Sequence, residues 1–211
     1  MMVSVEAGER RRSTVALRCL IFLIVVLLAT AVMVAQQLGA GAYVAELGST
    51  DPDEARHFVT ALMVADHAAA GFPAPSAFAA DYALNAPQAL PLARLTLFHG
   101  LAGGWLGLFT PTPPAALLPP AVLAALLVVS AGWATARAAG VLPAVAVGFV
   151  LAALPLLREA SFVLGLDLPL ALVTLLSALA FGRHMRRGTS ASAPLFPAAG
   201  AGGVLIAPAG A

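Results

Sequence analysis

The chain has 211 residues, of which 61% are hydrophobic and only 10% are charged, and its mean hydropathy is +0.95. A soluble domain carries about a quarter charged residues and about half apolar ones. The composition therefore excludes an ordinary soluble domain and indicates an integral membrane protein. The net charge of +1 does not by itself indicate a type of partner. We expect no nucleic-acid partner. A single cysteine, Cys19, provides neither a disulfide framework nor a zinc-binding set.

The first apolar segment runs from about residue 15 to residue 38 and follows a short positive stretch within residues 1–14. A spanning helix needs about 20 apolar residues, so this segment predicts a transmembrane helix. Arg10–Arg12 resemble the start of a signal peptide, but the apolar run exceeds the usual signal-peptide core. We expect an uncleaved first span, with the N-terminus in the cytoplasm, in a multi-pass protein of the cell membrane.

An acidic region follows this span, since six of the ten acidic residues lie within residues 46–81. Thr50 or Asp51 can cap a helix, and Pro52 suits the first helical position. Apolar residues at helical spacing continue from there, and Gly71 to Pro75 provide a stop. The pattern predicts a helix from about Pro52 to Ala70 with one apolar side.

Three further segments approach the length of a span: about residues 115–139, 141–157 and 166–182. One more apolar segment, residues 90–109, is interrupted by proline, arginine and histidine. If it crossed the membrane, the Arg183–Arg187 cluster would face outward, although Lys and Arg near span ends stay in the cytoplasm. We therefore predict an all-α polytopic fold with about four transmembrane helices, and an extracytoplasmic loop, residues 39–110, that contains interfacial helices.

This organisation divides the chain into a cytoplasmic N-terminus (1–14), a transmembrane region (15–187) and a C-terminal tail (188–211). The tail is rich in Gly, Pro, Ala and Ser and has no helical period, so we expect disorder. Its abrupt start suggests that the chain is truncated or frameshifted.

Three short motifs occur in order along the transmembrane region. The outer loop opens with Asp53-Glu54 in Asp-Pro-Asp-Glu-Ala-Arg-His, and Tyr82-Ala-Leu-Asn-Ala-Pro follows later in that loop. Asp167, in Leu-Asp-Leu-Pro-Leu, falls in the outer turn before the fourth span. This order resembles the N-terminal third of polyprenol-phosphate-dependent GT-C glycosyltransferases, in the group of protein mannosyltransferases and aminoarabinose transferases, and covers about residues 13–187.

The resemblance implies transfer of a sugar from a polyprenyl-phosphate donor to an acceptor on the outer face of the membrane, with membrane lipid as the surrounding partner. Such a reaction needs a base for the acceptor and positive charge or a divalent metal for the departing phosphate. Members of the family have many more spans. They also often carry a Lys or a double proline where this chain has Pro87-Gln88.

Asp53 is the residue that the resemblance makes the catalytic base, and the alternative is that it only stabilises a helix start. Glu54 points about 100° away and suits a structural or supporting role near the substrate. His57 shares the face of Asp53 and could orient it or bind a metal, or make an ordinary hydrogen bond. Arg56 could bind the donor phosphate or pair locally with an acidic side chain.

Asp167 interrupts an apolar stretch, where a charge is costly and therefore tends to be functional or paired. It is a candidate substrate-binding residue that we expect near Asp53, with an Arg158–Asp167 pair as the alternative. The remaining polar residues of the loop, among them Asp66 and His99, are expected to be solvated.

The main alternative to the enzyme is a non-catalytic, truncated membrane protein related to the same family. A small transporter or channel subunit would need polar residues deep inside several spans. The predicted spans contain few such residues, chiefly Ser130, Thr135, Thr174 and Ser177.

Overall fold

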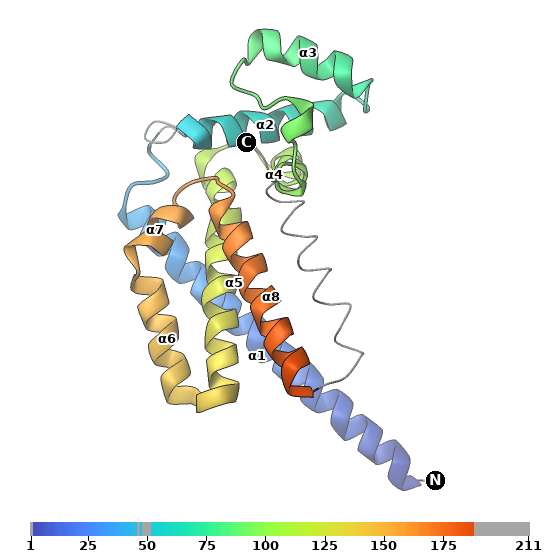
Figure 1. Ribbon diagram of the computed structural model, residues 1–211, viewed down its shortest axis with the longest axis vertical. Coiled ribbons are helices and arrows are strands. Elements are labelled where there is room, and N and C mark those ends of the chain that lie inside the picture. The colour runs from blue at the N-terminus through green and yellow to red at the C-terminus, as the bar shows by residue number, and fades with distance from the viewer. Residues whose placement is uncertain (1, 46, 48–51, 188–211) are drawn as a thin grey trace.

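The computed structural model describes residues 2–45, 47 and 52–187, and the predicted tail and the predicted caps Thr50 and Asp51 lie outside that set. Helices make up the fold, and no strand occurs in the part of the chain that the structure describes (Figure 1). The elements are α1 (Met2–Gly39), α2 (Pro52–Ala69), α3 (Pro75–Asn85), the 3₁₀ helix η1 (Leu92–Arg94), α4 (Leu97–Leu108), α5 (Pro113–Ala139), α6 (Val141–Ala153), α7 (Pro155–Ser161) and α8 (Asp167–Arg187).

The long helices form a bundle around α5, which packs against α1, α6 and α8. Chain direction alternates: α1 and α6 run toward the end that carries α2, and α5 and α8 run away from it (Figure 1). The start of α1 and the end of α8 therefore lie at the same end of the bundle, and the predicted outer loop lies at the other. This alternation agrees with the predicted topology, while the side of the membrane on which each end lies stays a prediction.

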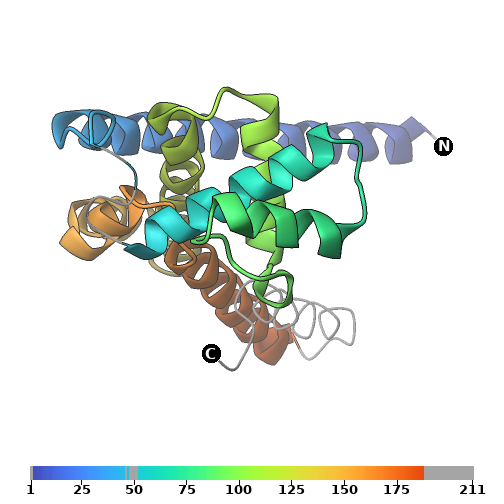
Figure 2. The same ribbon diagram turned by 90° about the horizontal axis from the view of Figure 1, so that it is seen from above.

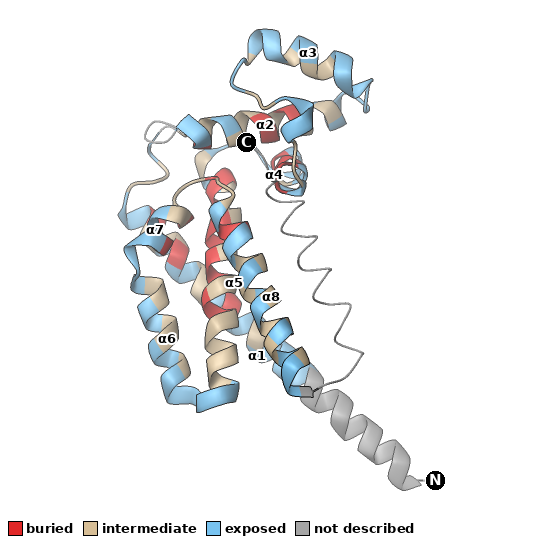
Figure 3. Ribbon diagram, viewed as in Figure 1, coloured by how far each residue is buried: buried red, intermediate tan, exposed pale blue. Residues whose placement is uncertain are grey.

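Among the described residues, three helices are long and apolar enough to cross a membrane: α1 from Ala16 to Gly39, α5, and α8 from Asp167 to Arg186. A fourth candidate is the pair of α6 and α7, whose axes differ by 62°. Many large apolar side chains on these helices are exposed, as lipid contact requires (Figure 3). The prediction of a polytopic all-α protein with about four spans is confirmed.

The predicted span 141–157 is broken rather than continuous. Leu154 adopts an extended conformation, with ψ of 124°, directly before Pro155. A residue before proline avoids the helical region, and proline supplies no N–H to the preceding helix. The 13 residues of α6 reach only about 20 Å at 1.5 Å per residue, so the pair, and not α6 alone, has the length of a span.

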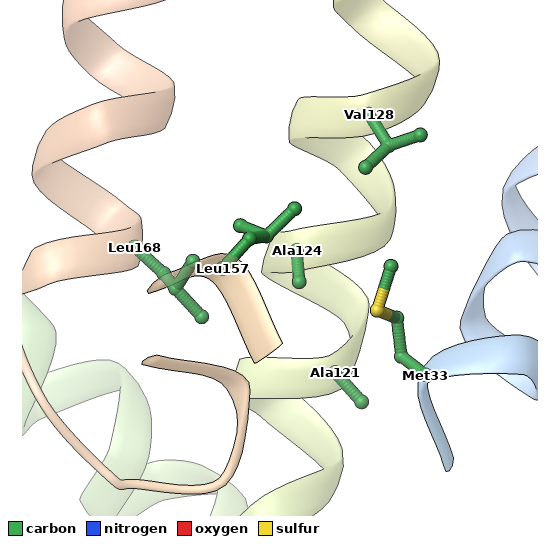
Figure 4. Close-up of a cluster of buried hydrophobic side chains, with 6 residues drawn as sticks. All are labelled: Met33, Ala121, Ala124, Val128, Leu157 and Leu168. Atoms are coloured by element: carbon green, nitrogen blue, oxygen red, sulfur yellow. The ribbon is translucent and has the colours of Figure 1, made fainter. Parts of the chain in front are cut away.

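The bundle core lies where α5 meets its neighbours (Figure 4). Ala121 and Ala124 on α5 allow close approach, and Met33 of α1 fills the space beside them. The buried Gln37 strengthens this contact, because its Nε2 donates to the backbone oxygens of Leu117, at 3.0 Å, and Ser161. These bonds join the end of α1 to both α5 and α7.

A second layer covers one end of the bundle, where α2 crosses over α4 (Figures 1 and 2). Both helices lie transverse to α5, and the described candidate spans include no helix from segment 90–109, while the position of the two helices at a membrane interface stays a prediction. Gly103 permits the crossing: a Cβ there would lie 2.7 Å from the carbonyl oxygen of Ala61. The layer packs on the bundle through a buried cluster that includes Phe98, Leu106 and Leu164.

Candidate functional site

The first turn of α2 places the two adjacent carboxylates on different sides of the helix. Asp53 is exposed, and Arg56, one turn later, donates from Nη1 to its Oδ1 at 2.7 Å. Both side chains stay accessible, at 69% for Asp53 and 49% for Arg56. The local pairing considered for Arg56 is therefore present, and it places a positive charge beside the predicted base.

Glu54 is buried, with 4% of its surface exposed, and points into the protein. Its Oε1 accepts the backbone N–H of Leu164 at 3.2 Å. Leu164 belongs to the turn between α7 and α8, so this bond joins the outer layer to the spanning bundle across 110 residues of sequence. Glu54 therefore makes a structural contact, and its supporting role near a substrate stays a prediction.

Asp167 is the first residue of α8 and is exposed. It lies three residues after Leu164, whose backbone N–H donates to Glu54. It lines a small cavity of about 210 Å³ together with Glu159 and apolar neighbours. No Arg158–Asp167 ion pair occurs among the described residues. The Glu54–Leu164 bond thus brings the segments of the two predicted acidic motifs to the same end of the bundle.

A pair of histidines forms a contact between α2 and α4. His57 Nδ1 lies 2.9 Å from His99 Nε2, and the two rings stack at a tilt with centroids 5.2 Å apart. Thr96 caps α4 and its backbone N–H points at His99 Nδ1, at 3.2 Å. We assign the His99 proton to Nε2 because Nδ1 accepts from this N–H, so His99 donates to His57.

The expectation that His99 is solvated is wrong: the side chain is 0% exposed. Burial, with a smaller electrostatic contribution from His57, lowers the pKa of His99 to about 4. The ring is therefore neutral at physiological pH and acts as a fixed hydrogen-bonding group. Sequence analysis missed this role, although Thr96-Leu-Phe-His carries the spacing of a capping box, with histidine in place of the usual Glu or Gln.

Thr60, one helical turn after Arg56, is a further residue that sequence analysis missed. Its hydroxyl donates to the Arg56 backbone oxygen at 2.6 Å and accepts the N–H of Leu90 at 2.9 Å. The buried hydroxyl therefore attaches the segment after α3 to the middle of α2. The Tyr82 motif contacts α2 farther along the helix: Tyr82 donates to Asp66 at 3.1 Å, and burial with this carboxylate raises the pKa of Tyr82 to about 12.

An apolar cavity of about 470 Å³ opens beneath α4, between that helix, α5 and α8. Its walls carry Phe98 and Trp105 from α4, Leu118 and Val122 from α5, and Leu172 from α8. The indole N–H of Trp105 bonds to the backbone oxygen of Ala115 at 2.8 Å and fixes this wall. The cavity can accept hydrocarbon and offers almost no polar group to a water-soluble ligand.

The described residues contain no group of three or more His, Cys, Asp or Glu side chains that could hold a metal ion. We therefore assign no ligand set for the divalent metal considered in the sequence analysis. No protein-family model, curated protein or solved structure matches the chain. The functional assignment depends on the sequence resemblance and on the geometry of the site.

Proposed function

We propose that the chain is a membrane glycosyltransferase, or the part of one that carries the catalytic base. It transfers a sugar from a polyprenyl-phosphate donor to an acceptor on the outer face of the membrane. The observation that carries this proposal is the split of the Asp53–Glu54 pair. Glu54 is buried against the turn before α8, and Asp53 is held exposed on the outer layer beside Arg56.

The proposed chemistry places Asp53 as the general base. An acceptor hydroxyl transfers its proton to the Asp53 carboxylate while the acceptor oxygen bonds to the anomeric carbon of the donor sugar. The bond between that carbon and the phosphate oxygen breaks, and its electron pair leaves with polyprenyl phosphate. Arg56 is the nearest guanidinium to the base and can pair with the donor phosphate.

The other residues support this arrangement. Glu54 and the His57–His99 pair position α2 against the turn and against α4, respectively. Asp167 lies at the same end and is the candidate for binding donor or acceptor hydroxyls. The apolar cavity below α4 lies next to the outer layer and is suited to the hydrocarbon of a lipid-linked donor.

The proposal is tested by measuring release of polyprenyl phosphate, a product that is the same for every donor sugar. Membranes containing the full chain receive a panel of polyprenyl-phosphate hexoses and pentoses. Asp53→Asn keeps the size of the side chain but cannot accept a proton, so turnover should fall about 10²–10⁴-fold. Protein level and helix content should remain normal.

The matched control is Asp81→Asn, which removes an exposed carboxylate from α3 in the same layer. This variant should retain full turnover. Equal turnover by Asp53→Asn and wild type would refute the role of Asp53. Absence of turnover in the wild-type chain with every donor would instead favour the non-catalytic alternative.

A further inference from the structure

A second large cavity, of about 650 Å³, lies at the opposite end of the bundle from Asp53, between α1, α5 and α8. Its wall toward the middle of the bundle is mostly apolar and includes Phe22, Leu176 and Leu179, with Ser130 as the one polar side chain that lines it there. Its wall toward the end of the spans carries three arginines, Arg137, Arg183 and Arg186. The cavity therefore changes from hydrocarbon-like to cationic along the membrane normal.

Trp133 lies at the boundary between these two parts. Its ring packs edge-to-face on Phe22, with centroids 5.8 Å apart, and the Arg137 guanidinium lies 5.4 Å from the Trp133 ring centroid. Tryptophan concentrates at the boundary between hydrocarbon and head groups. Trp133 therefore marks the level at which a bound lipid would change from chain to head group.

The arginine end of the cavity has no acidic side chain among its lining residues. Arg186 donates from Nε to the backbone oxygen of Gly182 at 3.2 Å, and this bond uses one of the five N–H donors of its guanidinium. The acidic residues with described side chains lie at the other end, on α2, α3, α7 and the start of α8. An anion would balance the three guanidinium charges, and phosphate oxygens match guanidinium geometry.

We propose that this cavity binds one anionic phospholipid, with its phosphate head group between Arg137, Arg183 and Arg186 and an acyl chain along Phe22 and Leu176. Basic pockets between transmembrane helices are recognised sites for anionic head groups. A zwitterionic lipid would bring its own cation to the three arginines, and a free phosphate would leave the apolar wall uncovered. The site is separate from the proposed donor site, so either proposal can fail alone.

The test uses Trp133 as a reporter, in the Trp105→Phe background that leaves no other tryptophan. The protein is reconstituted into bilayers of phosphatidylcholine that contain either brominated phosphatidylglycerol or brominated phosphatidylcholine. Brominated chains quench tryptophan on contact, so the ratio of the two quenching constants gives the head-group preference at the cavity. We expect the anionic lipid to be preferred.

Arg183→Gln with Arg186→Gln should lower this preference by about fivefold for each arginine removed. These changes leave the Arg137–Trp133 contact in place. The control pair Arg94→Gln with Arg158→Gln removes the same charge away from the cavity and should leave the preference unchanged. Arg183→Lys with Arg186→Lys retains the charge and should retain most of the preference.

Equal quenching by both lipids in the parent protein would overturn the proposal. An equal loss of head-group preference in the Arg183→Gln, Arg186→Gln variant and in the Arg94→Gln, Arg158→Gln control would also overturn it. Loss of the preference on adding inorganic phosphate, compared with chloride at the same ionic strength, would assign the site to a free anion and also overturn it. Native mass spectrometry of the unmodified chain provides a second measurement. It should show one retained phosphatidylglycerol, lost in the Arg183→Gln, Arg186→Gln variant and kept in the control.

Discussion

The crossing of α2 over α4 depends on a missing side chain at Gly103, which makes Gly103→Ala the most direct test of the outer layer. An added Cβ would lie 2.7 Å from both the carbonyl oxygen of Ala61 and Cβ of Val64. These atoms belong to the backbone, or to the side chain next to it, so no rotamer change relieves the overlap. The helices must separate to reach the 3.4 Å at which ordinary contact begins, a shift of about 0.7 Å.

Such a shift loosens contacts that are now fully buried, including that of Ala61. Overpacking a tight contact costs about 1–3 kcal/mol, which corresponds to an equilibrium constant for opening of the layer that is about 5- to 150-fold larger. Gly104→Ala is the matched control, because its Cβ would meet nothing within 4 Å. Alanine is the better helix former by about 1 kcal/mol, so this control should leave α4 as stable as before or more so.

Amide hydrogen exchange, measured by mass spectrometry on the chain in lipid nanodiscs, can resolve the two helices. Peptides from α2 and α4 should exchange faster in Gly103→Ala, whereas peptides from α5 should change little. Unchanged or slower exchange of α2 and α4 in Gly103→Ala would refute the close crossing. Equally faster amide exchange in Gly103→Ala and Gly104→Ala would show that the effect comes from replacing a glycine in α4, and not from the close approach of α2 to Gly103.

Three further outcomes are expected. Glu54→Ala leaves the Leu164 N–H without its acceptor and should cost about 1–3 kcal/mol in thermal unfolding, while Glu54→Gln keeps an acceptor oxygen and should cost less. Folded His99 titrates near pH 4 and unfolded His99 near 6.5, so the unfolded state binds the extra proton between these values. Stability should therefore fall by at most about 1.4 kcal/mol per pH unit on acidification through that range, and His99→Gln should remove this slope where His67→Gln does not. In a Cys19→Ser background, Ser76→Cys and Arg186→Cys should react with impermeant reagents from opposite sides of the membrane, and reaction from one side would refute the topology.

The spans could be predicted from sequence because lipid acts on segment length and hydropathy, which are local properties. Residues 15–38, 115–139 and 166–182 each match a long helix of the structure. The break at Leu154 was also accessible in principle, since Pro155 follows it, but its 62° bend depends on where α7 packs. The exclusion of 90–109 as a span came from the placement of arginines and not from hydropathy.

The inner contacts of the site could not be predicted, because they join residues far apart in the sequence. Nothing local indicates that Glu54 accepts from Leu164, or that His57 meets His99. The sequence alone does not show that α2 lies over His99 and shields it from water. Burial of His99 is a consequence of the α2–α4 crossing, and that crossing depends in turn on Gly103.

The adjacent carboxylates Asp53 and Glu54 lie in different environments on α2, one exposed and one buried. The helical turn separates consecutive side chains by about 100°, so only one of the two can face the bundle. Glu54 faces inward, where its longer side chain reaches the N–H of Leu164 and joins α2 to the turn before α8. Asp53 then faces outward with little freedom, because its helix is attached on one side by Glu54 and on the other by His57. An exposed carboxylate whose helix is fixed on both sides is the arrangement that the proposed transfer to an incoming acceptor would require.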